Sequence, residues 1–261
     1  MKEKIYAAAV ILAAALFALV YKCNGVNEMQ DLKNTDPELS ALWNGFVDNE
    51  VKTHGSLDAK TRYLVLLAGN AAAQGRGEYE IILEEALSSG VSPVEVKEAL
   101  YQAVPYAGMS KIYDFIVITN KVFKEKGIKL PLEGQGGVNA QTRLAKGLDA
   151  QRRIFGAEHI DSMRAGAPAE LKHIQDYLSA NCFGDYYTRG GLDLKTRELL
   201  TFVVLVSMGG ADAQAKGHAG GNINIGNGRE TLLDAVTQLL PYIGYPRSLN
   251  AISAINSASK K

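Results

Sequence analysis

The chain of 261 residues is poor in cysteine, with Cys23 and Cys182 alone, and it has no Cys-x-x-Cys pair. Cys23 lies at the end of an N-terminal apolar run, so a structural disulfide between the two is not expected. No cluster of cysteine and histidine has the spacing of metal ligands. We therefore expect neither a metal site nor a cofactor, and we expect Cys182 to be a small buried side chain.

An excess of either charge is also absent, since Lys+Arg and Asp+Glu both number 28. No basic run is present, so nucleic acid is not an expected partner. Hydrophobic residues make up 47% and charged residues 21%, which is enough apolar material for a core and no sign of disorder. Alternation of period two is missing as well. The sequence therefore predicts an all-α fold.

The N-terminus has the form of a targeting segment. Lys2 and Lys4 precede an unbroken apolar run over residues 5–21, as in a secretory signal peptide. We predict that residues 1–25 are a signal peptide or an N-terminal anchor, and that the protein is exported to the periplasm or cell envelope. Cleavage, lipidation at Cys23 and an uncleaved anchor all remain open. Membrane contact is expected only through this segment, if it is uncleaved.

An internal repeat organises the rest of the chain. Residues 57–62 (LDAKTR) return as residues 192–197 (LDLKTR), and the corner 102–108 (QAVPYAG) returns as 238–244 (QLLPYIG). A repeat of this kind indicates one folding unit used twice. We predict a first repeat over residues 36–127, a glycine-rich linker over 128–141 and a second repeat over 142–261.

Local signals place the helix ends of each repeat. Asp58 and Asp193 are suitable N-caps, and residues 92–95 (SPVE) have the form of a capping box with proline at the first helical position. Pro105 is expected to stop the helix that this box begins.

The two copies differ where chemistry would occur. The second has Glu198 and His218, and the corresponding positions of the first hold Tyr63 and Ile82. The expected helices of Glu198 and His218 are consecutive and antiparallel, so the two side chains can meet. A carboxylate beside an imidazole favours the protonated ring, which keeps a usable proton near neutral pH.

The motifs of the second repeat and their spacing resemble those of the carboxymuconolactone decarboxylase family. The resemblance rests on residues 192–199, on His218 ahead of Gly226, and on residues 238–246 with Asn250. It implies an alkylhydroperoxidase D-like helical fold in two tandem repeats, of which the first has a degenerate site. It also implies self-association into a trimer or hexamer-like ring.

The peroxidase branch of this superfamily uses a Cys-x-x-Cys pair ahead of the histidine. Here these positions hold Ala211 and Gln214. Because a thiol peroxidase needs an attacking and a resolving thiol, this departure puts its chemistry in doubt.

The chemistry implied by the resemblance assigns roles to individual residues. Decarboxylation of a carboxymuconolactone leaves an electron pair that spreads into the lactone, and the carbon must then be protonated. We predict that His218 is the general acid and that Glu198 holds it. Gln214, one helical turn earlier, would donate a hydrogen bond to the small-molecule substrate.

Other side chains are candidates for substrate binding. Arg189 or Arg197 would pair with a substrate carboxylate, since a guanidinium suits bidentate binding. Arg189 is the better candidate because Arg197 recurs as Arg62. Tyr242 is a further candidate, although its recurrence as Tyr106 favours a packing role for both.

Three functions remain open on the sequence. The first is a lyase that acts on a carboxylated lactone or a similar small organic acid. The second is a peroxidase-type oxidoreductase of the same superfamily without the cysteine pair, and the third is a non-catalytic oligomeric binding or assembly protein. A purely structural role is also possible for both residues. Glu198 can be a charge that suits the start of a helix, and His218 can be a packed polar group.

Overall fold

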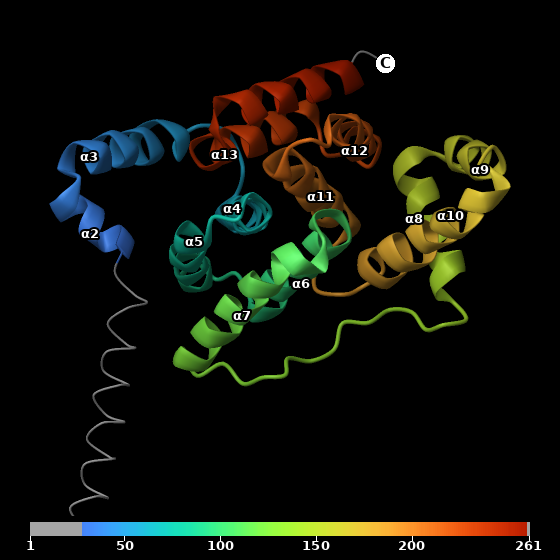
Figure 1. Cartoon of the computed structure of the whole chain (residues 1–261), viewed down its shortest axis with the longest axis horizontal. Coiled ribbons are helices and arrows are strands. Elements are labelled where there is room, and N and C mark those ends of the chain that lie inside the picture. Colours follow the sequence, from blue (N-terminus) through green and yellow to red (C-terminus); the bar gives the residue numbers. More distant parts are fainter. Residues whose placement is uncertain (1–27, 260–261) are drawn as a thin grey trace, which may run out of the picture. The chain divides into compact units, whose positions relative to one another are not determined.

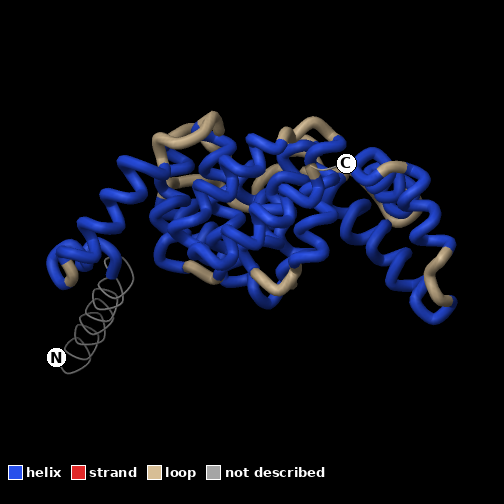
Figure 2. The backbone as a smooth tube through the Cα atoms, turned by 90° about the horizontal axis from the view of Figure 1, so that it is seen from above, coloured by secondary structure: helices blue, strands red, loops and turns tan. Residues whose placement is uncertain are grey.

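The computed structural model describes residues 28–259 of the chain. These residues form helices and connecting loops without any strand (Figures 1 and 2), which confirms the predicted all-α fold. The predicted signal peptide or anchor, residues 1–25, lies outside the described residues. Among the helices of the described range, none combines the length and the apolar character that a membrane span requires.

The chain divides into two compact units, with the boundary in the sequence between Glu50 and Val51. The described part of the first unit consists of α2 (Glu28–Thr35), α3 (Pro37–Phe46) and most of the π-helical turn η1 (Val47–Val51). Pro37 begins α3 as predicted. The predicted first repeat therefore starts in one unit and continues in the other.

The second unit begins with four helices of the first repeat, which are α4 (Ala59–Ala73), α5 (Arg76–Ser88), α6 (Pro93–Ala107) and α7 (Met109–Glu125). Asp58 caps α4, because its carboxylate accepts a hydrogen bond from the Thr61 amide at 3.0 Å. Ser92 and Glu95 form both hydrogen bonds of the predicted capping box at the start of α6.

Residues 126–142 contain no helix, and they lead into the second half of this unit. It comprises α8 (Arg143–Phe155), α9 (Ala157–Ala165), the 3₁₀ turn η2 (Ala169–Leu171), α10 (Lys172–Tyr177), the π-helix η3 (Leu178–Tyr187), α11 (Leu194–Met208), α12 (Asp212–Asn224) and α13 (Arg229–Ala258). Asp193 caps α11 through the Thr196 amide at 2.8 Å.

The repeated corner breaks its helices at glycine rather than at proline. Gly108 has φ 89° and Gly244 has φ 78°, a backbone region that glycine adopts without steric cost. The prediction that Pro105 stops its helix is wrong, since α6 continues to Ala107 and contains Pro105 in its last turn. A proline there removes one hydrogen bond, whereas the positive φ of Gly108 ends the helix.

The two repeats share one hydrophobic core. Helices α4 and α11 are apolar nearly all round and pack against each other (Figure 1). Such helices must be buried on every side, and their central residues, among them Leu64, Leu67, Phe202 and Val203, are fully buried in a single cluster. The repeats therefore interlock within one unit.

Polar side chains of α6 hold the start of the second repeat. Glu98 accepts hydrogen bonds from both Arg189 and Arg197, each at 2.9 Å at its shortest, and Gln102 accepts one from Arg197 at 3.2 Å. Glu98 is 1% exposed and Arg197 is fully buried. These contacts fix the segment that leads into α11.

The corresponding residues of α13 hold the start of the first repeat in the same way. Asp234 accepts hydrogen bonds from the amide and hydroxyl of Ser56 at 2.8 and 3.1 Å. Gln238 donates to the carbonyls of Val51 and His54 at 2.7 and 3.1 Å. Each repeat thus supplies a helix that anchors the entry to the other.

We predict that Glu98→Ala lowers the free energy of unfolding by about 3–5 kcal/mol, because it leaves the buried guanidinium of Arg197 and the half-buried one of Arg189 without a counter-charge. The matched change Asp114→Ala removes the carboxylate of an exposed pair with Arg76 and should cost less than about 1 kcal/mol. Urea denaturation of both variants measures the difference, and equal effects would contradict the anchoring role of Glu98.

Candidate functional site

The side chains of Glu198 and His218 meet across α11 and α12. Nδ1 of His218 lies 2.7 Å from Oε1 of Glu198. Glu198 is fully buried, and the His218 side chain remains 11% exposed. No hydrogen bond to Nε2 of His218 is found within the described range. The structure therefore brings together the two residues of the predicted pair, while their catalytic role stays a prediction.

The second oxygen of Glu198 is bound from the π-helix η3. The Tyr187 hydroxyl donates to Oε2 of Glu198 at 2.7 Å. The same hydroxyl lies 2.7 Å from Oγ1 of Thr201 and 3.1 Å from the hydroxyl of Tyr106. An ionised carboxylate is an acceptor at both oxygens, and these contacts occupy both. The carboxylate is thereby fixed in position.

Burial and the adjacent carboxylate keep the two tyrosines neutral. Burial raises the pKa of Tyr187 well above its ordinary value, and the negative charge of Glu198 raises it further. Burial likewise raises the pKa of Tyr106 well above its ordinary value. Tyr187 therefore remains a hydrogen-bond donor to Glu198 across the physiological range of pH.

Two aromatic rings confine the imidazole. The ring of Tyr106 lies edge-on to His218 with centroids 5.4 Å apart, and Phe155 does the same at 5.2 Å. Tyr106 belongs to α6 of the first repeat, and Phe155 belongs to α8. The second repeat carries the Glu198–His218 pair, and the corner of the first repeat supplies one of the walls around the imidazole.

Among the three glycines of α12, Gly217, Gly220 and Gly221, only Gly221 is needed for the close approach of α12 to α11. A Cβ atom on Gly221 would lie 2.6 Å from Oε1 of Glu198 and 2.7 Å from Ile154, whereas one on Gly217 or Gly220 would meet nothing. Asn222 donates to the carbonyls of Glu198 and His218 at 3.0 and 2.8 Å. The close approach and these bonds fix the spacing of the two helices.

The two predicted carboxylate-binding arginines lie beside Glu98 rather than beside His218. Arg197 binds Glu98, Gln102 and two backbone carbonyls, and it is fully buried. Both terminal nitrogens of Arg197 are therefore engaged, and its Nε is buried without a hydrogen-bond partner in the described range. This arrangement favours a structural role for Arg197 over substrate binding. Arg189 forms a bidentate pair with Glu98. Arg189 is partly exposed and lines a cavity that includes neither Glu198 nor His218.

The other two predicted substrate-binding residues have different surroundings. Gln214 is exposed on α12, one turn before His218, so its role stays a prediction. Tyr242 is partly buried and packs against the main hydrophobic core, which favours the packing role that its recurrence indicated.

Sequence reasoning missed Tyr187, Thr201 and Phe155 as members of the site, and it assigned Tyr106 to packing. The segment 181–191 carries an unusual density of aromatic residues that the first repeat lacks, and this signal could have identified Tyr187. The contact of Tyr106 with His218 links residues far apart in the chain, and no local pattern predicts it.

Cys182 lies close to the site, and its thiol is buried. It is 6% exposed, and burial raises its pKa to about 12, with a smaller contribution from Glu198. A thiolate is the reactive form of cysteine. Within residues 28–259, no three histidine, cysteine or acidic side chains are grouped as a metal site would require.

The arrangement has relatives among known proteins. The profile of the carboxymuconolactone decarboxylase family matches residues 37–119 and 172–257, one region in each repeat. The chain belongs to this family. It is also similar to a 4-carboxymuconolactone decarboxylase from Acinetobacter baylyi, at 25% identity over 111 residues. That alignment covers 42% of this chain and 82% of the relative, in keeping with the duplication in this family member.

We predict that Gly221→Ala destabilises the protein by about 1–3 kcal/mol, because the added methyl group overpacks the contact with Glu198. Gly220→Ala, at the adjacent open position of the same helix, should instead stabilise it by up to about 1 kcal/mol. Thermal or urea unfolding measures both. A stabilising effect of Gly221→Ala would show that the close approach of α12 to Glu198 is not needed.

We also predict that the native protein does not react with iodoacetamide at Cys182 between pH 7 and 9, because the thiol stays protonated well above this range. The same protein unfolded in urea should react fully. Mass spectrometry of the peptide that contains Cys182 measures both, and rapid alkylation of the native protein would restore thiol chemistry as a candidate.

Proposed function

We propose that this family member is a lyase that removes CO2 from a carboxylated lactone or a similar small organic acid, with His218 as the general acid. The observation that carries the proposal is the 2.7 Å contact between Nδ1 of His218 and the buried Glu198 carboxylate. Membership of the family supports the same class of reaction. The name of the Acinetobacter relative, a 4-carboxymuconolactone decarboxylase, gives 4-carboxymuconolactone as the first substrate to test.

The proposed reaction has two steps. The bond between the substrate carbon and its carboxylate breaks, CO2 leaves, and the electron pair spreads into the lactone carbonyl as an enolate. A proton from Nε2 of His218 then adds to the carbon, and the neutral ring recovers a proton from water. Protonation by a positioned histidine contributes about 10²–10⁴-fold to such steps.

The geometry suits His218 to this role. With Nδ1 directed at Glu198, Nε2 is the nitrogen left to face a substrate. The hydrogen bond to the Glu198 carboxylate sets the orientation of the ring and its tautomer. Tyr187 fixes the carboxylate in turn. Glu198 and Tyr187 therefore act through His218, as positioning residues.

The aromatic rings around His218 favour cleavage of the bond between the substrate carbon and its carboxylate. The rings of Tyr106 and Phe155 lie beside His218, nearly perpendicular to the imidazole, and the two arginines near α11 are engaged by Glu98. A substrate carboxylate beside these rings would exchange its water shell for an apolar wall, which favours neutral CO2 over the charged reactant. Gln214 is the predicted donor at the open side.

The alternative of a peroxidase is not supported by Cys182, the one cysteine of the described range. Cys182 is buried and its thiol has a raised pKa, so it lacks the thiolate that attacks a peroxide. Export through residues 1–25 and assembly into a ring remain proposals. Export would separate the protein from cytoplasmic aromatic degradation, so related lactones should be assayed beside 4-carboxymuconolactone.

We predict that His218→Ala lowers kcat for decarboxylation at least about 100-fold, because the proton donor is lost. Glu198→Gln should cause a loss of similar size, and Tyr187→Phe a smaller one. His159→Ala changes an exposed histidine of α9 and should leave kcat unchanged. The loss of lactone absorbance measures turnover, and circular dichroism with light scattering checks helicity and oligomer size.

The result that would contradict the proposed function is specific. If the wild-type protein consumes the lactone and His218→Ala retains its full rate, His218 is not the acid. If no carboxylated lactone is consumed, and Glu198→Gln or His218→Ala changes only the oligomer size, the pair has a structural role.

A further inference from the structure

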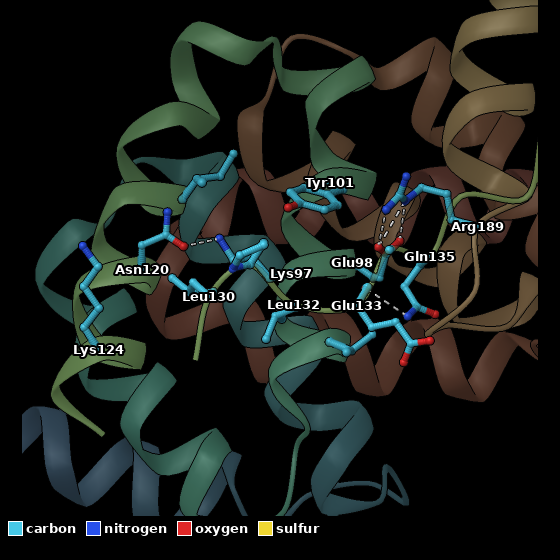
Figure 3. A pocket seen from close by; sticks show the side chains of 14 residues that line it. Lys97, Glu98, Tyr101, Asn120, Lys124, Leu130, Leu132, Glu133, Gln135 and Arg189 are labelled. Carbon is cyan, nitrogen blue, oxygen red and sulfur yellow. Dashed lines mark hydrogen bonds and ion pairs between the residues drawn. The ribbon is translucent and has the colours of Figure 1, made fainter. Parts of the chain in front are cut away.

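A cavity lies between α6, α7 and the connection that follows α7. Its volume is about 520 Å³, within the range of about 300–1,000 Å³ that small-molecule sites occupy. Its lining includes Lys97, Glu98, Tyr101, Asn120, Leu132 and Arg189 (Figure 3). It includes neither Glu198 nor His218, so the proposed lyase site does not explain it.

The ammonium group of Lys97 has no carboxylate partner in the described range. The residue is only 6% exposed. Its Nζ donates to the neutral Oδ1 of Asn120 at 2.5 Å and lies 5.9 Å from the ring centroid of Phe123. Burial lowers the pKa of Lys97, and no nearby acid offsets this effect. A buried cation without a counter-charge reduces stability, so its presence in a cavity wall calls for an anion.

The acidic residue nearest in sequence cannot serve as that anion. The Glu98 carboxylate is taken by Arg189 and Arg197 together. Lys124 adds a further cation to the lining, and Glu133 is the other acid there. Figure 3 shows the Lys97–Asn120 pair at one end of the cavity and the Glu98–Arg189 pair at the other, with Tyr101 between them. The end of the cavity at Lys97 is therefore cationic.

The geometry at Lys97 suits a carboxylate in particular. Because Oδ1 of Asn120 accepts from Lys97, the Nδ2 group of Asn120 is the remaining donor beside the ammonium. An ammonium and an amide N–H side by side match the two oxygens of a carboxylate. Val94, Ile116, Leu130 and Leu132 give the cavity apolar walls between Lys97 and the Glu98–Arg189 pair.

From these contacts we propose that the cavity binds a small organic monocarboxylate with an apolar or aromatic body. The carboxylate pairs with Lys97 and Asn120, and the apolar body lies against Tyr101 and the leucines of the connection after α7. This site is additional to the one at His218. It is tested by binding, and it stands or falls independently of any lyase activity.

The test uses benzoate and 3-phenylpropanoate as probes, with benzamide and 3-phenylpropanamide as neutral controls of the same shape. Isothermal titration and saturation-transfer NMR measure binding to the full chain. We expect saturable binding of at least one carboxylate, and a loss of at least about tenfold in affinity for its amide. Failure of both carboxylates to bind at about 10 mM, or equal binding of acid and amide, overturns the proposal.

Lys97→Met is the informative variant, because it keeps the length of the side chain and removes the charge. It should weaken carboxylate binding at least about tenfold and leave the melting temperature unchanged or higher, since an unpaired buried cation is removed. Lys111→Met, at an exposed position of α7, is the matched control and should change neither. Asn120→Leu provides a second test and should also weaken binding.

Three results would overturn the assignment of the cavity. A lower melting temperature of Lys97→Met with unchanged binding would show that Lys97 has only a structural role. A change of oligomer size in Lys97→Met would indicate that this face joins copies of the chain. Loss of probe binding in His218→Ala, which leaves this cavity intact, would place the probe at the other site.

Discussion

The candidate site depends on one buried carboxylate. Glu198 is fully buried, and an isolated charge in that position would carry a large desolvation cost. Tyr187 and His218 offset this cost by binding one oxygen each. Because these two partners come from η3 and α12, the requirement to satisfy Glu198 holds three elements in register. The constraint that orients the imidazole is thus the same one that fixes the local fold.

Two adjacent residues of α11 point to different partners. Arg197 is bound by Glu98 and Gln102 of α6, and Glu198 is bound from η3 and α12. Neighbouring positions on a helix differ by about 100° in direction. One helix start therefore joins the first repeat on one side and supports the candidate chemistry on the other.

The first repeat contributes to the candidate site although it lacks the Glu198–His218 pair. The first repeat has Tyr63 where the second has Glu198, so it lacks the paired acid. It contributes Tyr106 instead, whose ring contacts His218, while the equivalent Tyr242 packs on the shared core. The corner of the first copy thus forms a wall of the candidate site in the second. The connection between the two repeats also contributes to a cavity, since residues 130–135 line the one at Lys97.

The sequence by itself determined the local and repeated features. The caps at Asp58 and Asp193 act within one helical turn, and the pairing of Glu198 with His218 follows from two consecutive helices. Tertiary structure alone decided which side chains surround them. The ring of Tyr106 contacts His218, and Glu98 binds both Arg189 and Arg197. Among the glycines of α12, only Gly221 lies against the Glu198 side chain. These contacts join residues that are distant in the chain, and their geometry depends on how the two repeats interlock, which no local pattern records.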